Sequence, residues 1–108
     1  MDQEMEIGFS MIMAAGDSKN LAMEAMDLAE AGNMEQAQGK LEEATEKLNE
    51  AHKAHQGCLT RLANGEEVGA GLILTHAMDH LTAAELTIQT AQRVMRLCQR
   101  LSALEAKG

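Results

Sequence analysis

The chain has 108 residues, which is typical of one domain, and it carries a formal net charge of −8. This acidity argues against nucleic acid as a partner, because nucleic-acid binding needs a cationic face, and against anionic membrane surfaces. Proline, tryptophan and tyrosine are absent, and Phe9 is the one phenylalanine. Alanine, leucine, methionine, glutamate, lysine and glutamine dominate. Since these residues lose little side-chain freedom in a helix, an all-α fold is predicted.

Two breaks divide the chain into predicted helices. Gly32 suits the left-handed conformation that ends a helix, and Asn33 with Gln36 forms a capping-box pattern for the next one. Asn64-Gly65 ends a second helix, and an acidic pair follows that suits a helix start. Short connections favour an antiparallel three-helix bundle in a single domain, residues 1–108. The predicted helices cover residues 3–31, 34–63 and 68–106.

The second and third predicted helices each carry a row of apolar residues spaced by three and four, as in a coiled-coil seam. In the second helix the row is Met34, Ala37, Leu41, Ala44, Leu48, Ala51, His55, Cys58 and Leu62, with His55 as its polar member. In the third it is Leu74, Ala77, Leu81, Ala84, Ile88, Ala91, Met95 and Cys98. The two cysteines are therefore expected to be free thiols that pack, as in a cytosolic protein.

The first predicted helix is less regular. Its row is Gly8, Ile12, Ala15, Ala22, Met26 and Ala29, and Lys19 interrupts it. In the second helix, Gly39 and Gly57 each cost about 1 kcal/mol relative to alanine, and we interpret them as points of close helix approach.

The third helix carries another row, offset from the first: His76, Asp79, Ala83, Leu86 and Thr90. One helix with two rows must satisfy two sets of partners. The bundle within the chain can cover one row, and we expect the other to face further copies of the chain. No apolar stretch approaches the roughly 20 residues that span a bilayer, and no signal-peptide pattern opens the chain. A cytoplasmic protein without membrane insertion is expected.

His76, Asp79 and His80 share one helical face, because they are spaced by three and four residues. Three interpretations compete. The residues could be ordinary polar side chains with partners. They could bind zinc, since histidines four apart are common zinc ligands, although the acid is aspartate rather than glutamate and no third ligand is evident. They could include a nucleophilic histidine that accepts a phosphoryl group. The local pattern does not choose among them.

The sequence also resembles a known family, the lactose/cellobiose-type IIA components of the bacterial phosphoenolpyruvate-dependent sugar phosphotransferase system. The most specific segment, His76-Ala77-Met78-Asp79-His80-Leu81, resembles the family's His-(Gly/Ala)-Gln-Asp-His-Leu. The other matching segments are Gly8-Phe9, Ala15-Gly16-Asp17, Ala29 with Gly32, and Leu48-Asn49-Glu50-Ala51-His52. The resemblance covers nearly the whole chain.

This resemblance implies a homotrimer of three-helix subunits, a nine-helix assembly. It implies that His76 accepts a phosphoryl group from the carrier HPr, at Nε2, and passes it to a cysteine of the cognate IIB component during uptake of a lactose-, cellobiose- or chitobiose-type sugar. It implies that Asp79 meets its symmetry mates on the three-fold axis around a shared divalent cation, usually Mg²⁺. Converging carboxylates would otherwise repel one another.

Three residues depart from the family's pattern. Met78 and His55 stand where glutamine is usual, and Lys19 stands where arginine is usual. We expect His80 to be a hydrogen-bonding neighbour of His76, and His52 to lie on the surface. The main alternative function is a non-catalytic helical interaction module, which would explain the rows and the acidity but not the spacing of His76 and Asp79.

Overall fold

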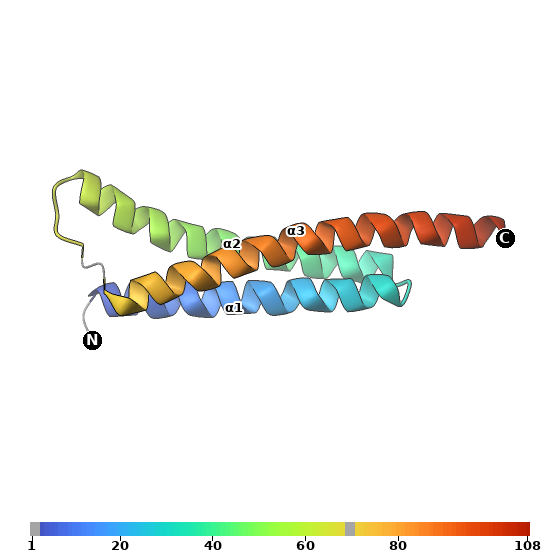
Figure 1. Cartoon of the computed structure of the whole chain (residues 1–108), viewed down its shortest axis with the longest axis horizontal. Coiled ribbons are helices and arrows are strands. Elements are labelled where there is room, and N and C mark those ends of the chain that lie inside the picture. Colours follow the sequence, from blue (N-terminus) through green and yellow to red (C-terminus); the bar gives the residue numbers. More distant parts are fainter. Residues whose placement is uncertain (1–2, 69–70) are drawn as a thin grey trace.

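The computed structural model describes residues 3–68 and 71–108, and every regular element in these residues is a helix. The chain runs through α1 (Gln3–Glu30), α2 (Met34–Ala63) and α3 (Leu72–Lys107), as Figure 1 shows. The molecule is a slender rod with extents of 62 × 23 × 18 Å. The predicted all-α, antiparallel three-helix fold is confirmed. None of the described helices is long and apolar enough to cross a membrane.

The first turn reverses the chain within a few residues. Gly32 has φ +87°, the left-handed conformation predicted for it, and the Asn33 amide donates to the Leu28 carbonyl at 2.8 Å. The predicted capping box is wrong, because the Asn33 side chain makes no capping hydrogen bond to α2. The backbone hydrogen bonds of the turn satisfy carbonyls at the end of α1 and do not cap the start of α2.

The second connection is longer than predicted. Gly65 has φ +80° and ends α2, but α3 begins at Leu72 rather than at residue 68. Gly71 is extended and precedes the helix, and its carbonyl accepts the hydrogen bond from the Thr75 amide. Glu66 does not open a helix. It lies 3.5 Å from Arg61 in an ion pair at the end of α2.

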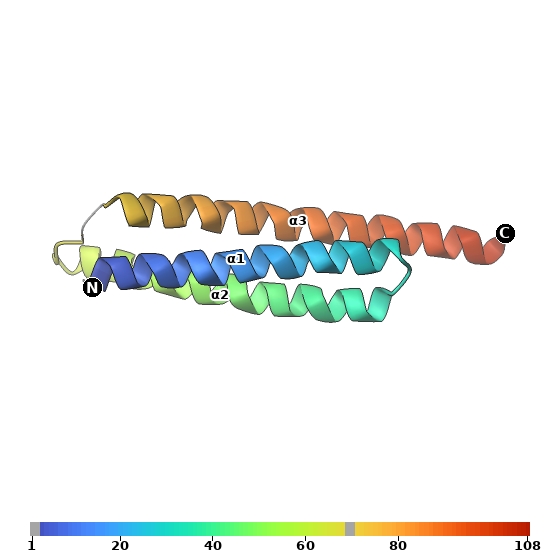
Figure 2. The same ribbon diagram turned by 90° about the horizontal axis from the view of Figure 1, so that it is seen from below.

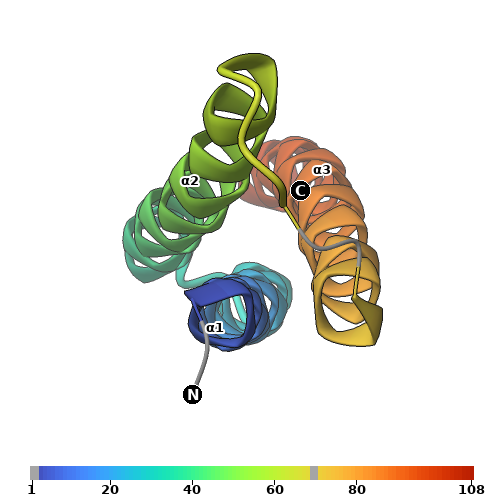
Figure 3. The ribbon, with the colours of Figure 1, turned by 90° about the vertical axis from the view of Figure 1, so that its left-hand side faces the viewer.

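The helix α1 packs along both other helices. In the end-on view of Figure 3 the three helices form a triangle. Contacts between α2 and α3 are fewer. Figure 1 shows why, because the C-terminal part of α2 diverges from the start of α3. At the opposite end α3 projects past the α1–α2 turn (Figures 1 and 2).

The core consists of two clusters of mostly small side chains. The cluster nearer the first turn includes Ala25, Leu41, Ile88 and Met95. The other cluster includes Met11, Ala51, Ala77 and Leu81, and Leu48 packs against both. The predicted row on α3 is buried from Ala77 to Met95. The α2 row is mostly buried too, but Leu62 is 58% exposed, because α2 has diverged from the bundle at that point.

The row predicted on α1 needs a correction. The buried residues of this helix include Gly8, Met11, Ala15, Ser18, Ala22, Ala25 and Ala29, which are spaced by three and four without interruption. Lys19 therefore does not break the row, because the row passes through Ser18. Its hydroxyl is fully buried and donates to the Ala44 carbonyl on α2 at 2.8 Å. The apolar pattern could not indicate this position, because a serine is small enough to pack in a core when a backbone carbonyl accepts its hydrogen bond.

The close helix approach occurs at a different glycine from those predicted. A Cβ atom added at Gly39 or Gly57 would meet no described atom within 4 Å, so neither is a point of close approach in the part of the chain that the structure describes. A Cβ atom at Gly8 would lie 2.8 Å from Cγ1 of Ile73. Gly8 therefore lets the first turn of α3 sit against α1, next to the segment that carries His76.

Candidate functional site

The candidate residues lie in the first turns of α3. Ala77 and Leu81 are buried against α1 and anchor this part of the helix. His76 and Asp79 are exposed, and His80 is half-buried. The packing of one helical face thus turns the other face, with both predicted site residues, toward the outside.

The two histidines contact each other directly. Nε2 of His80 lies 3.1 Å from Nε2 of His76, and the rings meet edge to face with centroids 4.6 Å apart. In this hydrogen bond one ring donates its N–H and the other accepts with its lone pair. The predicted pairing of His80 with His76 is therefore present, and it engages the nitrogen at which the phosphoryl group is expected.

A shallow apolar hollow adjoins His76. It is lined by Met5, Gly71, Leu72, Ile73 and His76, and has a volume of about 570 Å³. Leu72 is 87% exposed at its edge. Exposed apolar groups around a polar reactive group are typical of a surface that another protein covers.

Asp79 belongs to the second row predicted on α3. All five residues of that row, His76, Asp79, Ala83, Leu86 and Thr90, are exposed in the single chain. Leu86 is 63% exposed. None of the ion pairs formed by the described residues includes Asp79. The described part of one chain contains no group of three or more His, Cys, Asp or Glu side chains that could hold a metal ion. A metal held by three carboxylates, as the sequence predicts, would therefore need Asp79 from other copies of the chain.

His52 has a partner that the sequence did not indicate. It lies on the surface, as predicted, but its Nε2 is 2.7 Å from Oε1 of Glu85. This contact joins α2 to α3 where the two helices still run close together. Both side chains are partly exposed, so the pair contributes modestly to stability.

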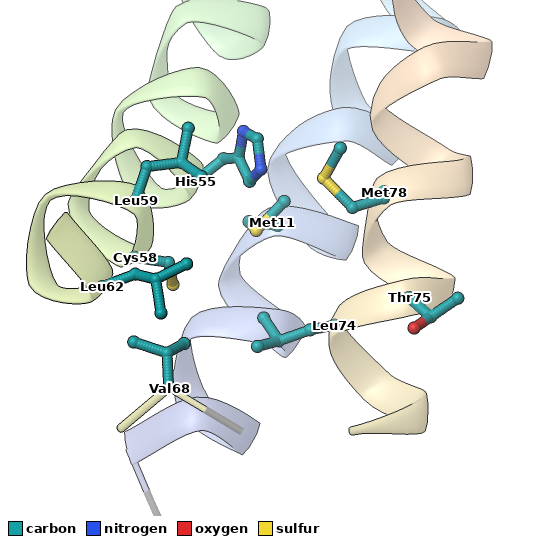
Figure 4. A pocket seen from close by; sticks show the side chains of 9 residues that line it. All are labelled: Met11, His55, Cys58, Leu59, Leu62, Val68, Leu74, Thr75 and Met78. Atoms are coloured by element: carbon teal, nitrogen blue, oxygen red, sulfur yellow. The ribbon is translucent and has the colours of Figure 1, made fainter. Parts of the chain in front are cut away.

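Met78 and His55, which stand where the family usually has glutamine, do not line the same space as His76. Met78 and His55 both line a second cavity, which is formed by α1, the C-terminal part of α2, and α3 (Figure 4). Neither lines the hollow beside His76. The substitution of Met78 for glutamine therefore changes the inner side of α3 rather than the surface on which His76 lies. Cys58 is buried in this same region, and Cys98 is half-buried against the other core cluster, so both are free thiols that pack, as predicted.

A slender bundle that presents an imidazole pair on an open surface suits a carrier that other proteins reach. It suits less well an enzyme that encloses a small substrate. The zinc interpretation, one of the three left open by the sequence, gains no support, because the described residues bring no third ligand to the two histidines.

Comparison with known proteins identifies this carrier. Residues 6–99 match the family described as "PTS system, Lactose/Cellobiose specific IIA subunit". The cellobiose-specific EIIA component of Lactococcus lactis subsp. lactis is 42% identical over 106 residues, covering 98% of this chain and 91% of the relative. The crystal structure of the cellobiose-specific enzyme IIA from Bacillus anthracis superposes with a TM-score of 0.90 at 33% identity, covering 100% of this chain and 96% of that one.

A third protein shares the fold at lower sequence identity. It is the IIA(Chitobiose) protein of Escherichia coli, solved in complex with HPr, with a TM-score of 0.74 and 24% identity over 94% of this chain and 99% of that one. The chain therefore belongs to the lactose/cellobiose-specific IIA subunits of the phosphotransferase system. The family predicted from the sequence is confirmed, and so is its general function as a phosphoryl carrier in sugar transport.

Proposed function

We propose that His76 is the residue of this carrier that is phosphorylated. Phospho-HPr donates the phosphoryl group to His76, and a cysteine of the cognate IIB component receives it from His76. The observation that carries the proposal is the exposed imidazole of His76 at the edge of an apolar hollow. Two different proteins must reach the same nitrogen in turn, and an open surface allows this. The acidic chain also suits basic patches on its partners, since complementary charge speeds encounter.

The transfer proceeds by attack of the Nε2 lone pair of His76 on the phosphorus of phospho-HPr. The N–P bond to His76 forms while the bond to the donor nitrogen breaks. The second transfer repeats this with the IIB thiolate as nucleophile. Such reactions depend mainly on positioning and charge stabilisation. His80 contributes to both, because it is within hydrogen-bond distance of the reacting nitrogen.

We further propose that the chain works as a cytoplasmic homotrimer in which the exposed row on α3 forms the three-fold seam. The side chains of this row lie exposed on the described chain, and Leu86 in it is 63% exposed. The seam would bring three Asp79 carboxylates together. Their oxygens are the hard donors that Mg²⁺ prefers, so the residues fit a shared divalent cation whose charge would offset their repulsion.

The experiment that tests His76 is phosphorylation with phosphoenolpyruvate, enzyme I and HPr. We expect acid-labile phosphate on the wild-type chain and none on His76→Gln, with His52→Gln as a matched control that keeps its label. Label that persists on His76→Gln would place the acceptor elsewhere. A wild-type chain that takes no label would favour the alternative of a non-catalytic helical interaction module.

The trimer and the cation are tested together by Asp79→Leu. Light scattering should give three chains for the wild type, with a thermal midpoint that falls when divalent cations are chelated. In Asp79→Leu the trimer should persist without this dependence, because apolar side chains replace like charges on the axis. A monomeric wild-type chain would contradict this part of the proposal while leaving the role of His76 to its own assay.

A further inference from the structure

The cavity behind the phosphoryl site contains an unusual set of side chains. It lies where α2 diverges from the bundle, it has a volume of about 220 Å³, and His76 does not line it. Figure 4 shows that its lining comes from all three helices. Four of its nine lining residues are leucine or valine, as expected for a gap between helices.

Four of the lining residues carry donor atoms that bind metals. Met11 on α1 and Met78 on α3 bring thioether sulfurs, and Cys58 and His55 on α2 bring a thiol and an imidazole. Met11 is fully buried, Cys58 is 7% exposed and Met78 is half-buried. None of these four side chains forms a hydrogen bond or an ion pair with another described residue. Among the described residues, no aspartate or glutamate lines the cavity.

This combination selects one class of metal ion. Thiolate and thioether sulfurs with an imidazole are soft ligands, which favour Cu(I) and similar monovalent ions over hard cations such as Mg²⁺. A structural zinc site is disfavoured, because thioethers are poor ligands for zinc and only two stronger ligands are present. We propose that Met11, His55, Cys58 and Met78 form a Cu(I)-binding site between the three helices.

The surroundings of the cavity suit such an ion. Leu59 and Leu62 line it while remaining 51% and 58% exposed, so the cavity opens to solvent on the α2 side. Methionine side chains are flexible enough to adjust to an ion. Binding replaces the thiol proton of Cys58 with the metal and releases that proton, with no change of oxidation state. The ion would tie the diverging end of α2 to α1 and α3.

The test is a Cu(I) titration of the intact protein without oxygen, in competition with a chromogenic Cu(I) chelator. We expect one ion per chain and a higher thermal midpoint, because only the folded state brings together the three helices that carry the proposed ligands. Removing a residue that only hydrogen-bonds to a metal ligand costs about 10–100-fold in metal affinity. Cys58→Ala and Met78→Leu remove proposed ligands themselves, so each should weaken binding at least about ten-fold. Met78→Leu nearly conserves volume, so it remains informative if Cys58→Ala folds poorly.

Two matched variants control for nonspecific binding by sulfur. Cys98→Ala and Met95→Leu remove the same donor types from the other core cluster, and both should keep wild-type affinity. The proposal is overturned if no ion binds, or if affinity follows Cys98. It is also overturned if only Cys58→Ala loses binding, because the ion would then sit on a single reactive thiol. Phosphorylation of His76 is a separate assay and does not enter these outcomes.

Discussion

The Nε2 atoms of His76 and His80 share one hydrogen bond 3.1 Å long. If His76 is to attack phosphorus through Nε2, that nitrogen must carry the lone pair, so His80 must be the donor. The lone pair that accepts this hydrogen bond is the one that attacks phosphorus, so the bond must open as the phosphoryl group arrives, and the N–H of His80 is then free to donate to a phosphoryl oxygen. On the proposed role of His76, His80 is a positioning residue that would hold the reactive tautomer of His76 and then contact the transferred group.

We predict that His80→Leu slows phosphorylation of His76 by about 10²-fold or more, as when one preorganised donor is removed from a reaction centre. His80→Gln should recover much of the rate, because its amide can donate a similar hydrogen bond. The measurement is a rapid-quench time course with phospho-HPr, together with the lifetime of the phosphorylated chain. Equal rates for Leu and Gln variants would reduce His80 to a packing role.

Periodicity predicted most of the fold because each helix buries one narrow face. The rows through Ala77 on α3 and Ala44 on α2 are buried as expected. It failed at Ser18, because a buried hydroxyl with a backbone acceptor has no apolar signature. The predicted start of α3 is too early for a different reason, because the acidic residues at 66 and 67 resemble a helix start but precede the extended Gly71.

The site was predictable in part for a related reason. The spacing of His76, Asp79 and His80 places them on one face whatever the partners are, and the structure keeps them there. Contacts between distant helices leave no mark in local spacing. The pairing of His52 with Glu85 and the shared cavity of His55 and Met78 depend on how α2 and α3 pack together in the fold.

The proposed trimer seam predicts the effect of a charge at Leu86. Leu86→Glu should convert the trimer into monomers, because three carboxylates would have to be buried together near the axis. Gln92→Glu is the matched control, since Gln92 is also exposed on α3 but lies toward α2. Light scattering at several protein concentrations distinguishes them. A Leu86→Glu chain that stays trimeric would show that the seam lies on another face.

The buried hydroxyl of Ser18 predicts a measurable loss of stability. Ser18→Ala removes the 2.8 Å hydrogen bond to the Ala44 carbonyl, and a typical bond of this kind contributes about 0.5–1.5 kcal/mol. Ser10→Ala, on the exposed side of the same helix, has the same change in helix propensity without the bond. The difference in the free energy of unfolding between the two variants, from urea denaturation, should lie in that range. Equal stability would mean that the hydroxyl contributes nothing.

Gly8 and Gly57 predict opposite effects of the same substitution. Gly57 lies inside α2 with nothing within 4 Å of an added Cβ atom, so Gly57→Ala should stabilise the chain by about 0.5–1 kcal/mol. At Gly8 the added atom would lie 2.8 Å from Cγ1 of Ile73, and such overpacking typically costs about 1–3 kcal/mol, which outweighs the helical gain.

Denaturation of both glycine variants under the same conditions gives the comparison. Gly8→Ala should also disturb the start of α3, so its phosphorylation by phospho-HPr should slow, whereas Gly57→Ala should match the wild type. The slower transfer follows because Ile73 lines the hollow beside His76 and would be displaced by the new methyl group. Two variants with equal gains in stability would mean that α1 and α3 are not held at the distance that Gly8 permits.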